Sequence, residues 1–86
     1  MISVGYAKPF NRRFLALEPL LQEEAIEKIE LFKNPRHHKR LKVHKLHGEQ
    51  SHLYAFSVNY HIRIVFAYTG KQSAVCLTIG THDEVY

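Results

Sequence analysis

The sequence predicts an α+β fold, in which an N-terminal strand and a helical hairpin pack on one face of a small antiparallel sheet. Apolar side chains recur with a helical period between residues 9 and 32, and from residue 41 onward they alternate with a strand period. Short polar turns separate the expected strands, and short connections favour antiparallel pairing. No repeat or linker divides the chain, so we expect a single domain over residues 1–86.

The first part of the chain predicts one strand and two helices. A short strand is expected over residues 2–7, and Pro9 suits the first turn of the helix that follows. Pro19 separates this helix from the next, because proline disfavours helical geometry in the residue before it, and Pro35 ends the second helix. The side chains expected to be buried are Phe10, Phe14 and Leu17 in the first helix and Leu21, Ala25, Ile29 and Phe32 in the second.

The remainder of the chain predicts four strands in close succession. They are expected over residues 41–46, 53–58, 60–68 and 74–79. The expected turns cover residues 47–51, Asn59 and residues 69–71. Gly80 follows the last strand and permits a backbone turn that most residues resist. His82 and Tyr86 lie in the short tail beyond it, where hydrophobic packing does not explain them.

Composition excludes several classes of protein. No segment is long and apolar enough to span a membrane, and the first residues lack the basic and apolar stretches of a signal peptide. The single cysteine, Cys76, lies in an apolar run and cannot form an internal disulfide, which fits a reducing compartment and a core position. A cytoplasmic protein without membrane contact is therefore expected.

Charge is distributed unevenly along the chain. The net charge is +4 with seven histidines in addition, and five of the eight acidic residues lie between residues 18 and 30. From Lys33 to Arg63 the chain carries seven Lys or Arg and six His but only one acid, Glu49. A basic, histidine-rich surface of this kind favours a polyanionic partner, nucleic acid first.

Four side chains from separate segments are candidates for chemistry. In the strand over residues 60–68, His61 and Arg63 alternate with the apolar residues and therefore share the opposite, open face. His44 lies in an earlier strand, and His82 and Tyr86 follow the last one. We expect His44, Arg63, His82 and Tyr86 to gather on the open face of the sheet.

These residue types suit cleavage of RNA without a metal ion. One imidazole can take a proton while another gives one, and a guanidinium can stabilise the extra charge of a pentacoordinate phosphate. The 2′-hydroxyl of the RNA would attack the adjacent phosphate, which leaves a 2′,3′-cyclic phosphate and a 5′-hydroxyl. Exposed tyrosine can stack on a base or donate its hydroxyl.

Simpler interpretations remain open for each feature. A basic strand face more often serves as a contact surface than as a catalytic site, and a single histidine is more often a surface or packing residue. Tyr54 and Phe56 fit either the core or a stacking platform. His44 and His47 suggest a metal site only weakly, because Cys76 is expected in the core and no carboxylates cluster nearby. We therefore expect no metal and no cofactor.

Three segments carry a resemblance that covers essentially the whole chain. Lys45-Leu46-His47-Gly48, the strand from Tyr60 to Phe66 and the ending from Ile79 to Tyr86 resemble the RelE/ParE superfamily of toxins from type II toxin–antitoxin modules. The Gly80-Thr81-His82 ending is most similar to the YafQ-type branch. The resemblance implies a RelE-like, microbial-RNase-like fold. It also implies either cleavage of mRNA in the ribosomal A site or, in the ParE branch, inhibition of DNA gyrase.

By position, the resemblance implies roles for the same four side chains. Arg63 matches the arginine that stabilises the scissile phosphate in several branches, and His82 matches a basic catalytic residue at the end of the last strand. Tyr86 matches a terminal aromatic that contacts RNA or aids catalysis, and His44 matches a histidine of the YafQ and YoeB branches. The additional residues expected to bind RNA are Arg40, Lys42, Lys45 and His61.

This chain also departs from the family pattern at three positions. Ala55 and Ser57 stand where RelE itself has two lysines, and Arg40 stands where YoeB has a glutamate. Acid–base catalysis would therefore fall to the histidines. We expect a metal-independent, ribosome-dependent mRNA endonuclease toxin that pairs with a cognate antitoxin. The alternatives are a gyrase-binding toxin of the ParE type and a degenerate homologue that retains only antitoxin binding.

Overall fold

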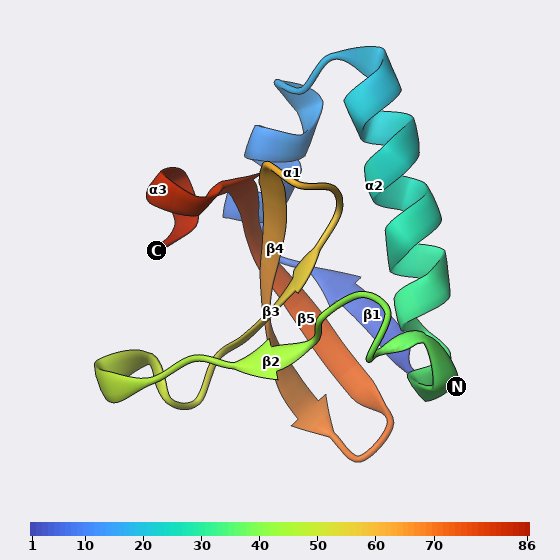
Figure 1. The fold of residues 1–86 in the computed structure, drawn as a ribbon, viewed down its shortest axis with the longest axis vertical. Helices are drawn as coiled ribbons and strands as arrows, with labels where there is room; N and C mark the ends of the chain where they lie inside the picture. The colour runs from blue at the N-terminus through green and yellow to red at the C-terminus, as the bar shows by residue number, and fades with distance from the viewer.

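A five-stranded sheet forms the centre of the molecule, with its strands in the order β1-β5-β4-β3-β2 (Figure 1). The computed structural model describes all 86 residues. The long helix α2 lies on one side of the sheet, and the short C-terminal helix α3 lies on the other. The elements are β1 (Ser3–Tyr6), α1 (Lys8–Leu15), α2 (Pro19–Phe32), 3-10 turn η1 (Pro35–His37), β2 (His44–Lys45), 3-10 turn η2 (Gly48–Gln50), β3 (Tyr54–Ser57), β4 (Ile62–Gly70), β5 (Ser73–Thr81) and α3 (His82–Val85).

The predicted α+β class is confirmed, but the sheet is mixed rather than antiparallel. Strands β2 to β5 pair antiparallel with their neighbours, whereas β1 pairs parallel with β5, from Ser3 opposite Ser73 to Tyr6 opposite Cys76. Short turns constrain only consecutive strands. A parallel pair needs a long connection, and here the helical hairpin and three strands supply it.

The strand predicted over residues 41–46 is wrong for most of its length. Only His44 and Lys45 pair with β3, and the preceding residues form turns. Lys42 has a φ of 59°, a left-handed conformation that is uncommon for residues other than glycine. The bend lets Leu41 sink into the main core, where it is 3% exposed, while its carbonyl accepts a hydrogen bond from the backbone of Ser57.

The strand predicted over residues 60–68 begins two residues later than expected. The side-chain oxygen of Asn59 accepts hydrogen bonds from the backbone amides of His61 and Ile62, each at 2.8 Å. These bonds form a turn that holds Tyr60 and His61 outside β4. His61 is therefore a turn residue and does not share a strand face with Arg63.

The main core lies between the sheet and the helical hairpin. Phe32 of α2 is fully buried and stacks on Phe56 of β3, with ring centroids 4.7 Å apart, and it meets Phe66 of β4 edge-on. Tyr54 packs against Phe66 on the same side. The structure therefore assigns Phe56 and Tyr54 to this core, and neither offers a stacking platform on the other face. The predicted helix stripes supply the rest of the contacts, with Phe10, Ala25 and Ile29 buried.

A second, smaller cluster covers part of the opposite face. It consists of Leu46, Ala55 and Val65, with Leu53 and Val85 packed against it. Because Val85 belongs to α3, hydrophobic packing does hold the C-terminal segment, contrary to the expectation of a tail that such packing does not explain. On this face, the exposed polar side chains therefore surround an apolar patch.

Cys76 lies in the main core as predicted, fully shielded from solvent. Burial raises the pKa of its thiol to about 12. The longest helix, α2, has 14 residues, and none of the helices combines the length and apolar character needed to cross a bilayer.

Candidate functional site

The register of the sheet places His44 and Arg63 on the same face. His44 lies opposite Ala55, and Ala55 lies opposite Val65, two residues along β4 from Arg63. Directly opposed residues point to the same side of a sheet, as do residues two apart on one strand. Strand spacing puts His44 about 10 Å across the sheet and about 7 Å along it from Arg63, so the two side chains share a face without being direct neighbours.

Arg63 is held against the turn that precedes its own strand. Its Nη1 donates to the backbone carbonyls of Asn59 at 2.7 Å, Tyr60 at 3.0 Å and Ile62 at 3.3 Å. A guanidinium has five N–H groups, so Nη2 and Nε keep their donors available for another partner. The turn therefore fixes the position of Arg63 and leaves part of its donor fork free.

The same turn is anchored to the helical hairpin. The side-chain amide of Asn59 donates to a carboxylate oxygen of Glu24 on α2, at 2.8 Å. Both side chains are half-buried, which limits the competition from water. Glu24 thus positions Arg63 indirectly, through Asn59.

A basic pocket of about 380 Å³ lies beside Arg63. It gathers cations from α2, from the turn before β2 and from β4, and no acidic side chain lines it. Clustered cations without acids favour an anionic ligand such as a phosphate. Its lining residues are Lys28, Arg40, Leu41, Lys42, Ser57, Val58, Asn59, Tyr60 and Arg63.

Helix α3 is attached to the end of β5 by a capping box. The backbone amide of Thr81 donates to the Glu84 carboxylate at 2.8 Å, and the amide of Glu84 donates to the Thr81 hydroxyl at 3.3 Å. These bonds hold the pKa of Glu84 below its ordinary value. Arg13 of α1 adds an exposed ion pair with Glu84 at 3.8 Å.

Gly80 gives room to side chains that pack closely over it and does not form an unusual backbone turn. A methyl group at this position would lie 2.8 Å from the Glu84 carboxylate and 3.2 Å from the Arg13 guanidinium. Its φ is not in the left-handed region, so the expectation of a turn that other residues resist is wrong. The absence of a side chain at residue 80 therefore leaves space for the Glu84 and Arg13 side chains in the positions that they occupy.

His82 and Tyr86 lie at the two ends of α3 and contact each other. Their rings meet edge-on with centroids 4.5 Å apart, and His82 Nδ1 lies 3.6 Å from the Asp83 carboxylate. Partial burial raises the pKa of Tyr86 above its ordinary value, and the positive charge of Arg63 offsets part of this rise. Arg63 pairs with Gly80 at the end of β5, so it lies near the start of α3, where His82 and Tyr86 meet. The phenol of Tyr86 stays protonated at neutral pH and is able to donate.

The backbone determines which nitrogen of His44 is free. Its Nδ1 lies 2.8 Å from the carbonyl oxygen of Lys42. Because a carbonyl oxygen only accepts, Nδ1 carries the hydrogen, and in the neutral ring Nε2 then carries the lone pair. The side chain is exposed, so that lone pair is available to a ligand.

The other predicted residues divide between two locations. Arg40 and Lys42 line the basic pocket with Arg63. Lys45 lies opposite Tyr54, which packs against the main core, so it lies on the hairpin side of the sheet, away from His44. The structure contains no group of three or more His, Cys, Asp or Glu side chains placed to hold a metal ion.

Sequence reasoning missed three parts of this site. Lys28 was not among the candidate residues, Asn59 was expected only as a turn residue, and Tyr60 was expected in a strand. The spacing of Thr81 and Glu84, a Thr followed three residues later by Glu, was a signal for a capped helix start. Lys28 and Tyr60 carry no local signal, because only tertiary packing brings them to the pocket.

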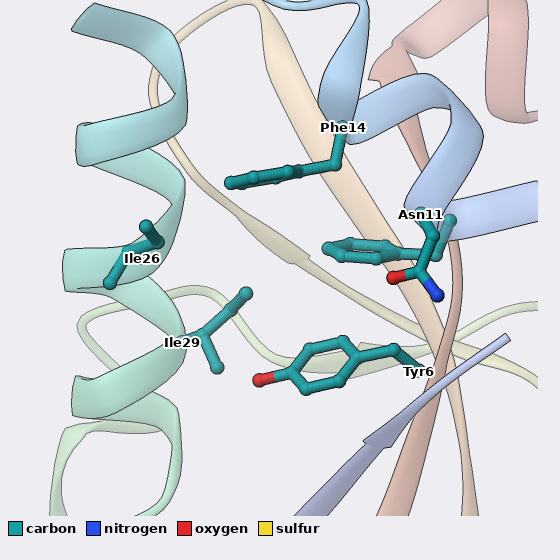
Figure 2. A pocket seen from close by; sticks show the side chains of 6 residues that line it. Tyr6, Asn11, Phe14, Ile26 and Ile29 are labelled. Carbon is teal, nitrogen blue, oxygen red and sulfur yellow. The ribbon is translucent and has the colours of Figure 1, made fainter. Parts of the chain in front are cut away.

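A separate apolar groove of about 220 Å³ lies between the helices, away from the basic pocket. Figure 2 shows the rings of Tyr6 and Phe14 directed toward Ile26 and Ile29 on α2. The two rings belong to a series with Phe10 between them, at centroid distances of 5.3 Å and 5.9 Å. Tyr6 and Ile26 are 43% and 52% exposed, so the groove presents apolar surface to solvent.

Comparison with known proteins identifies the fold. No protein-family model matches the sequence, and no curated protein matches it. Solved toxin structures match along nearly the whole chain. YafQ from E. coli strain BL21(DE3) has a TM-score of 0.75 at 10% identity, covering 100% of this chain and 99% of that one. The fold is that of the RelE/ParE toxins.

Two toxin–antitoxin complexes show the same RelE-like fold. The YoeB–YefM complex from Staphylococcus aureus has a TM-score of 0.74 at 10% identity and covers 95% of this chain and 98% of that one. The RelBE2 complex from Mycobacterium tuberculosis has a TM-score of 0.73 at 15% identity and covers 94% and 98%. The fold implied by the sequence resemblance is therefore confirmed.

Proposed function

We propose that this chain is the toxin of a type II toxin–antitoxin module and that it cleaves mRNA on the ribosome. The observation that carries the proposal is the group of Arg63, His82 and Tyr86, which adjoins a pocket lined by cations and shares a face with His44. The RelE-like fold supports the same reading, since its solved examples include YafQ and the toxins of two toxin–antitoxin complexes.

Each side chain has a step that suits its geometry. Nε2 of His44 accepts the proton of the RNA 2′-hydroxyl, whose oxygen attacks the adjacent phosphorus. The free donors of Arg63 stabilise the charge on the pentacoordinate phosphate. His82, in its protonated form, gives a proton to the departing 5′-oxygen. The products are a 2′,3′-cyclic phosphate and a 5′-hydroxyl, with Tyr86 donating its phenol to the RNA.

The openness of this site supports a role for the ribosome. His44 is exposed, and the His82 side chain is 70% exposed. Such a surface leaves free RNA mobile, and positioning of the reacting groups supplies a large part of most rate enhancements. A ribosome that holds the mRNA codon in place would supply that positioning.

Expression without antitoxin, followed by mapping of RNA ends, tests the proposal. The wild-type chain should arrest growth and produce RNA ends within A-site codons that carry 5′-hydroxyls. His82→Ala and Arg63→Ala should relieve arrest while remaining folded by circular dichroism, and His52→Ala, an exposed histidine outside the site, should remain toxic. A fully toxic double variant, with both residues replaced, would contradict the assignment of this site. Growth arrest with intact mRNA and a DNA-damage response would instead support a gyrase-directed toxin.

We propose that the apolar groove receives an acidic, amphipathic segment of the cognate antitoxin. The groove is lined by Tyr6, Phe14 and Ile26, and the adjoining helix α1 carries Lys8, Arg12 and Arg13 without any acid. Helix α2 carries glutamates, so an acidic segment complements the α1 side of the groove. In helix-in-groove recognition of this kind, an amphipathic helix lays its apolar face into a hydrophobic groove.

The antitoxin proposal is tested by co-purification with the protein encoded next to this one. Ile26→Glu places a charge in the groove and should weaken the complex at least tenfold. Leu20→Glu alters another exposed apolar residue of α2 that does not line this groove, and it should leave the affinity unchanged. Equal effects of the two substitutions would contradict the assignment of the groove.

A further inference from the structure

The turn between β3 and β4 presents Tyr60 to solvent beside the basic pocket. Tyr60 is the most exposed large hydrophobic residue of the protein, with 85% of its surface accessible to solvent. Isolated exposed aromatics are ordinary on protein surfaces. Tyr60 differs because it also lines the pocket that Arg40, Lys42 and Arg63 form.

The backbone of Tyr60 is held more firmly than its exposure suggests. The carbonyl of Tyr60 accepts a hydrogen bond from Arg63 Nη1 at 3.0 Å, and the side chain of Asn59 bonds to the two amides that follow Tyr60. The ring of Tyr60 meets the His61 ring in a T-shaped contact at 5.2 Å, and with the residue 85% exposed most of the ring surface is open to solvent. A rigid turn thus offers an aromatic face at little cost in conformational entropy.

The adjacent pocket has the charge and size expected for a nucleotide phosphate. Lys28, Arg40, Lys42 and Arg63 contribute to its wall. Two acids lie behind this wall without lining it: Glu27 is 3.4 Å from the Lys28 ammonium, and Glu24 accepts a hydrogen bond from Asn59 at 2.8 Å. A volume of about 380 Å³ falls within the range of small-ligand sites, roughly 300–1,000 Å³.

We infer that Tyr60 and the basic pocket form a nucleotide subsite, in which a base of single-stranded RNA stacks on Tyr60 and its phosphate enters the pocket. Aromatic faces next to cationic grooves are the usual means of binding single strands without sequence preference. The inference rests on the proposed function, because this subsite would bind a nucleotide adjacent to the one that is cleaved. Arg63 would bind the reacting phosphate and also form part of the wall of this subsite.

The test is binding of a 2′-O-methyl RNA trinucleotide, which has no 2′-hydroxyl and cannot be cleaved. Titration followed by NMR should move the ring resonances of Tyr60 upfield and shift the backbone signals of Arg40 and Lys42. Tyr60→Ala should weaken binding about 5-fold to about 100-fold, the range that loss of one stacked base produces. Tyr60→Phe should bind as the wild type does, whereas Tyr60→Leu, which is apolar but not aromatic, should bind as Tyr60→Ala does.

Two further measurements separate stacking from charge. Arg40→Gln should reduce the slope of log Kd against log salt by about 0.7, as expected when one phosphate contact to a single strand is lost, and Tyr60→Ala should leave that slope unchanged. A trinucleotide with one abasic position should bind the wild type and Tyr60→Ala equally.

The result that overturns the subsite is unchanged trinucleotide affinity in Tyr60→Ala, or no binding by the wild type at millimolar ligand. Neither result depends on catalysis. If the chain binds the trinucleotide through Tyr60 but produces no RNA ends in cells, the endonuclease proposal fails and the subsite stands. If it cleaves mRNA but Tyr60→Ala binds normally, only the subsite fails.

Discussion

Glu24 and Asn59 are joined by a hydrogen bond of 2.8 Å although 35 residues separate them in the chain. Glu24 belongs to the helical hairpin, and Asn59 belongs to the turn whose carbonyl groups hold Arg63. The bond connects the helical hairpin, which packs against the sheet in the main core, to the turn that holds Arg63 in the candidate site. The orientation of Arg63 therefore depends on residues that never touch a substrate.

Replacement of Asn59 should affect both stability and activity. Asn59→Ala removes three side-chain hydrogen bonds, to Glu24, His61 and Ile62, and should lower the free energy of unfolding by about 1–3 kcal/mol in urea titrations. RNA cleavage should fall further than this loss explains, because Arg63 loses its fixed position. Glu24→Gln keeps an acceptor oxygen and serves as the matched control. Full cleavage by a folded Asn59→Ala variant would contradict the positioning role.

Gly80→Ala should displace α3 while leaving the rest of the fold in place. The added methyl group would lie 2.8 Å from the Glu84 carboxylate, so the capping bonds to Thr81 should be lost at about 0.5–2 kcal/mol. We expect NMR shift changes confined to residues 79–86 and faster amide exchange at Tyr86.

Gly5→Ala provides the control for that substitution. A methyl group on Gly5 meets no atom within 4 Å, and the smaller freedom of the unfolded chain should keep or slightly raise stability. Equal effects of the two substitutions would show that close approach of α3 is not the reason for glycine at position 80.

The buried thiol of Cys76 should make the protein less stable in alkaline solution. Burial raises the pKa of Cys76 from its ordinary 9.0 to about 12, so above pH 9.0 the unfolded chain loses a proton that the folded chain keeps. The free energy of unfolding should fall by up to about 1.4 kcal/mol per pH unit as the pH rises from 9.0 toward 12. Below pH 9.0 the thiol is protonated in both states, so Cys76 should cause no such decrease.

Cys76→Ala tests the origin of this slope. The comparison is best made by urea unfolding between pH 9.0 and 10.0, because the ordinary tyrosine pKa is 10.0 and the raised values of Tyr6, Tyr68 and Tyr86 act above it. The variant should start lower in stability and show a flatter dependence on pH. Parallel curves for the two proteins would exclude Cys76 as the cause.

Phe32→Ala should remove much of the stability of this small domain. Phe32 is fully buried, stacks on His38 at 4.8 Å and on Phe56 at 4.7 Å, and its carbonyl lies 2.7 Å from His38 Nε2. Truncation of a buried phenylalanine costs about 3–5 kcal/mol, a large share of the roughly 5–15 kcal/mol that stabilises most domains. Leu20→Ala, at a side chain 77% exposed, should change stability by less than about 0.5 kcal/mol.

The elements that the sequence predicted well are those with a strong period. Both helices were expected because Pro9 and Pro19 precede regular apolar stripes. Four residues of the stripes are buried, and the other three pack against the core while partly exposed: Phe14, Leu17 and Leu21. The strand with Ile64 and Phe66 was expected for the same reason, since alternation reports which side of a strand is buried. The segment over residues 41–46 failed because burial of Leu41 outweighed local strand preference.

The amino-acid sequence alone specifies an apolar stripe on each helix, a basic middle segment and a histidine and a tyrosine at the end. These features depend on residue types and on their spacing along the chain, which can be read without a structure. Three features emerge only when the chain folds: β1 pairs with β5 in parallel, Lys28 and Tyr60 share a pocket with Arg63, and α3 starts beside Arg63. Such contacts join segments distant in the chain, so they follow from global packing and leave no local pattern.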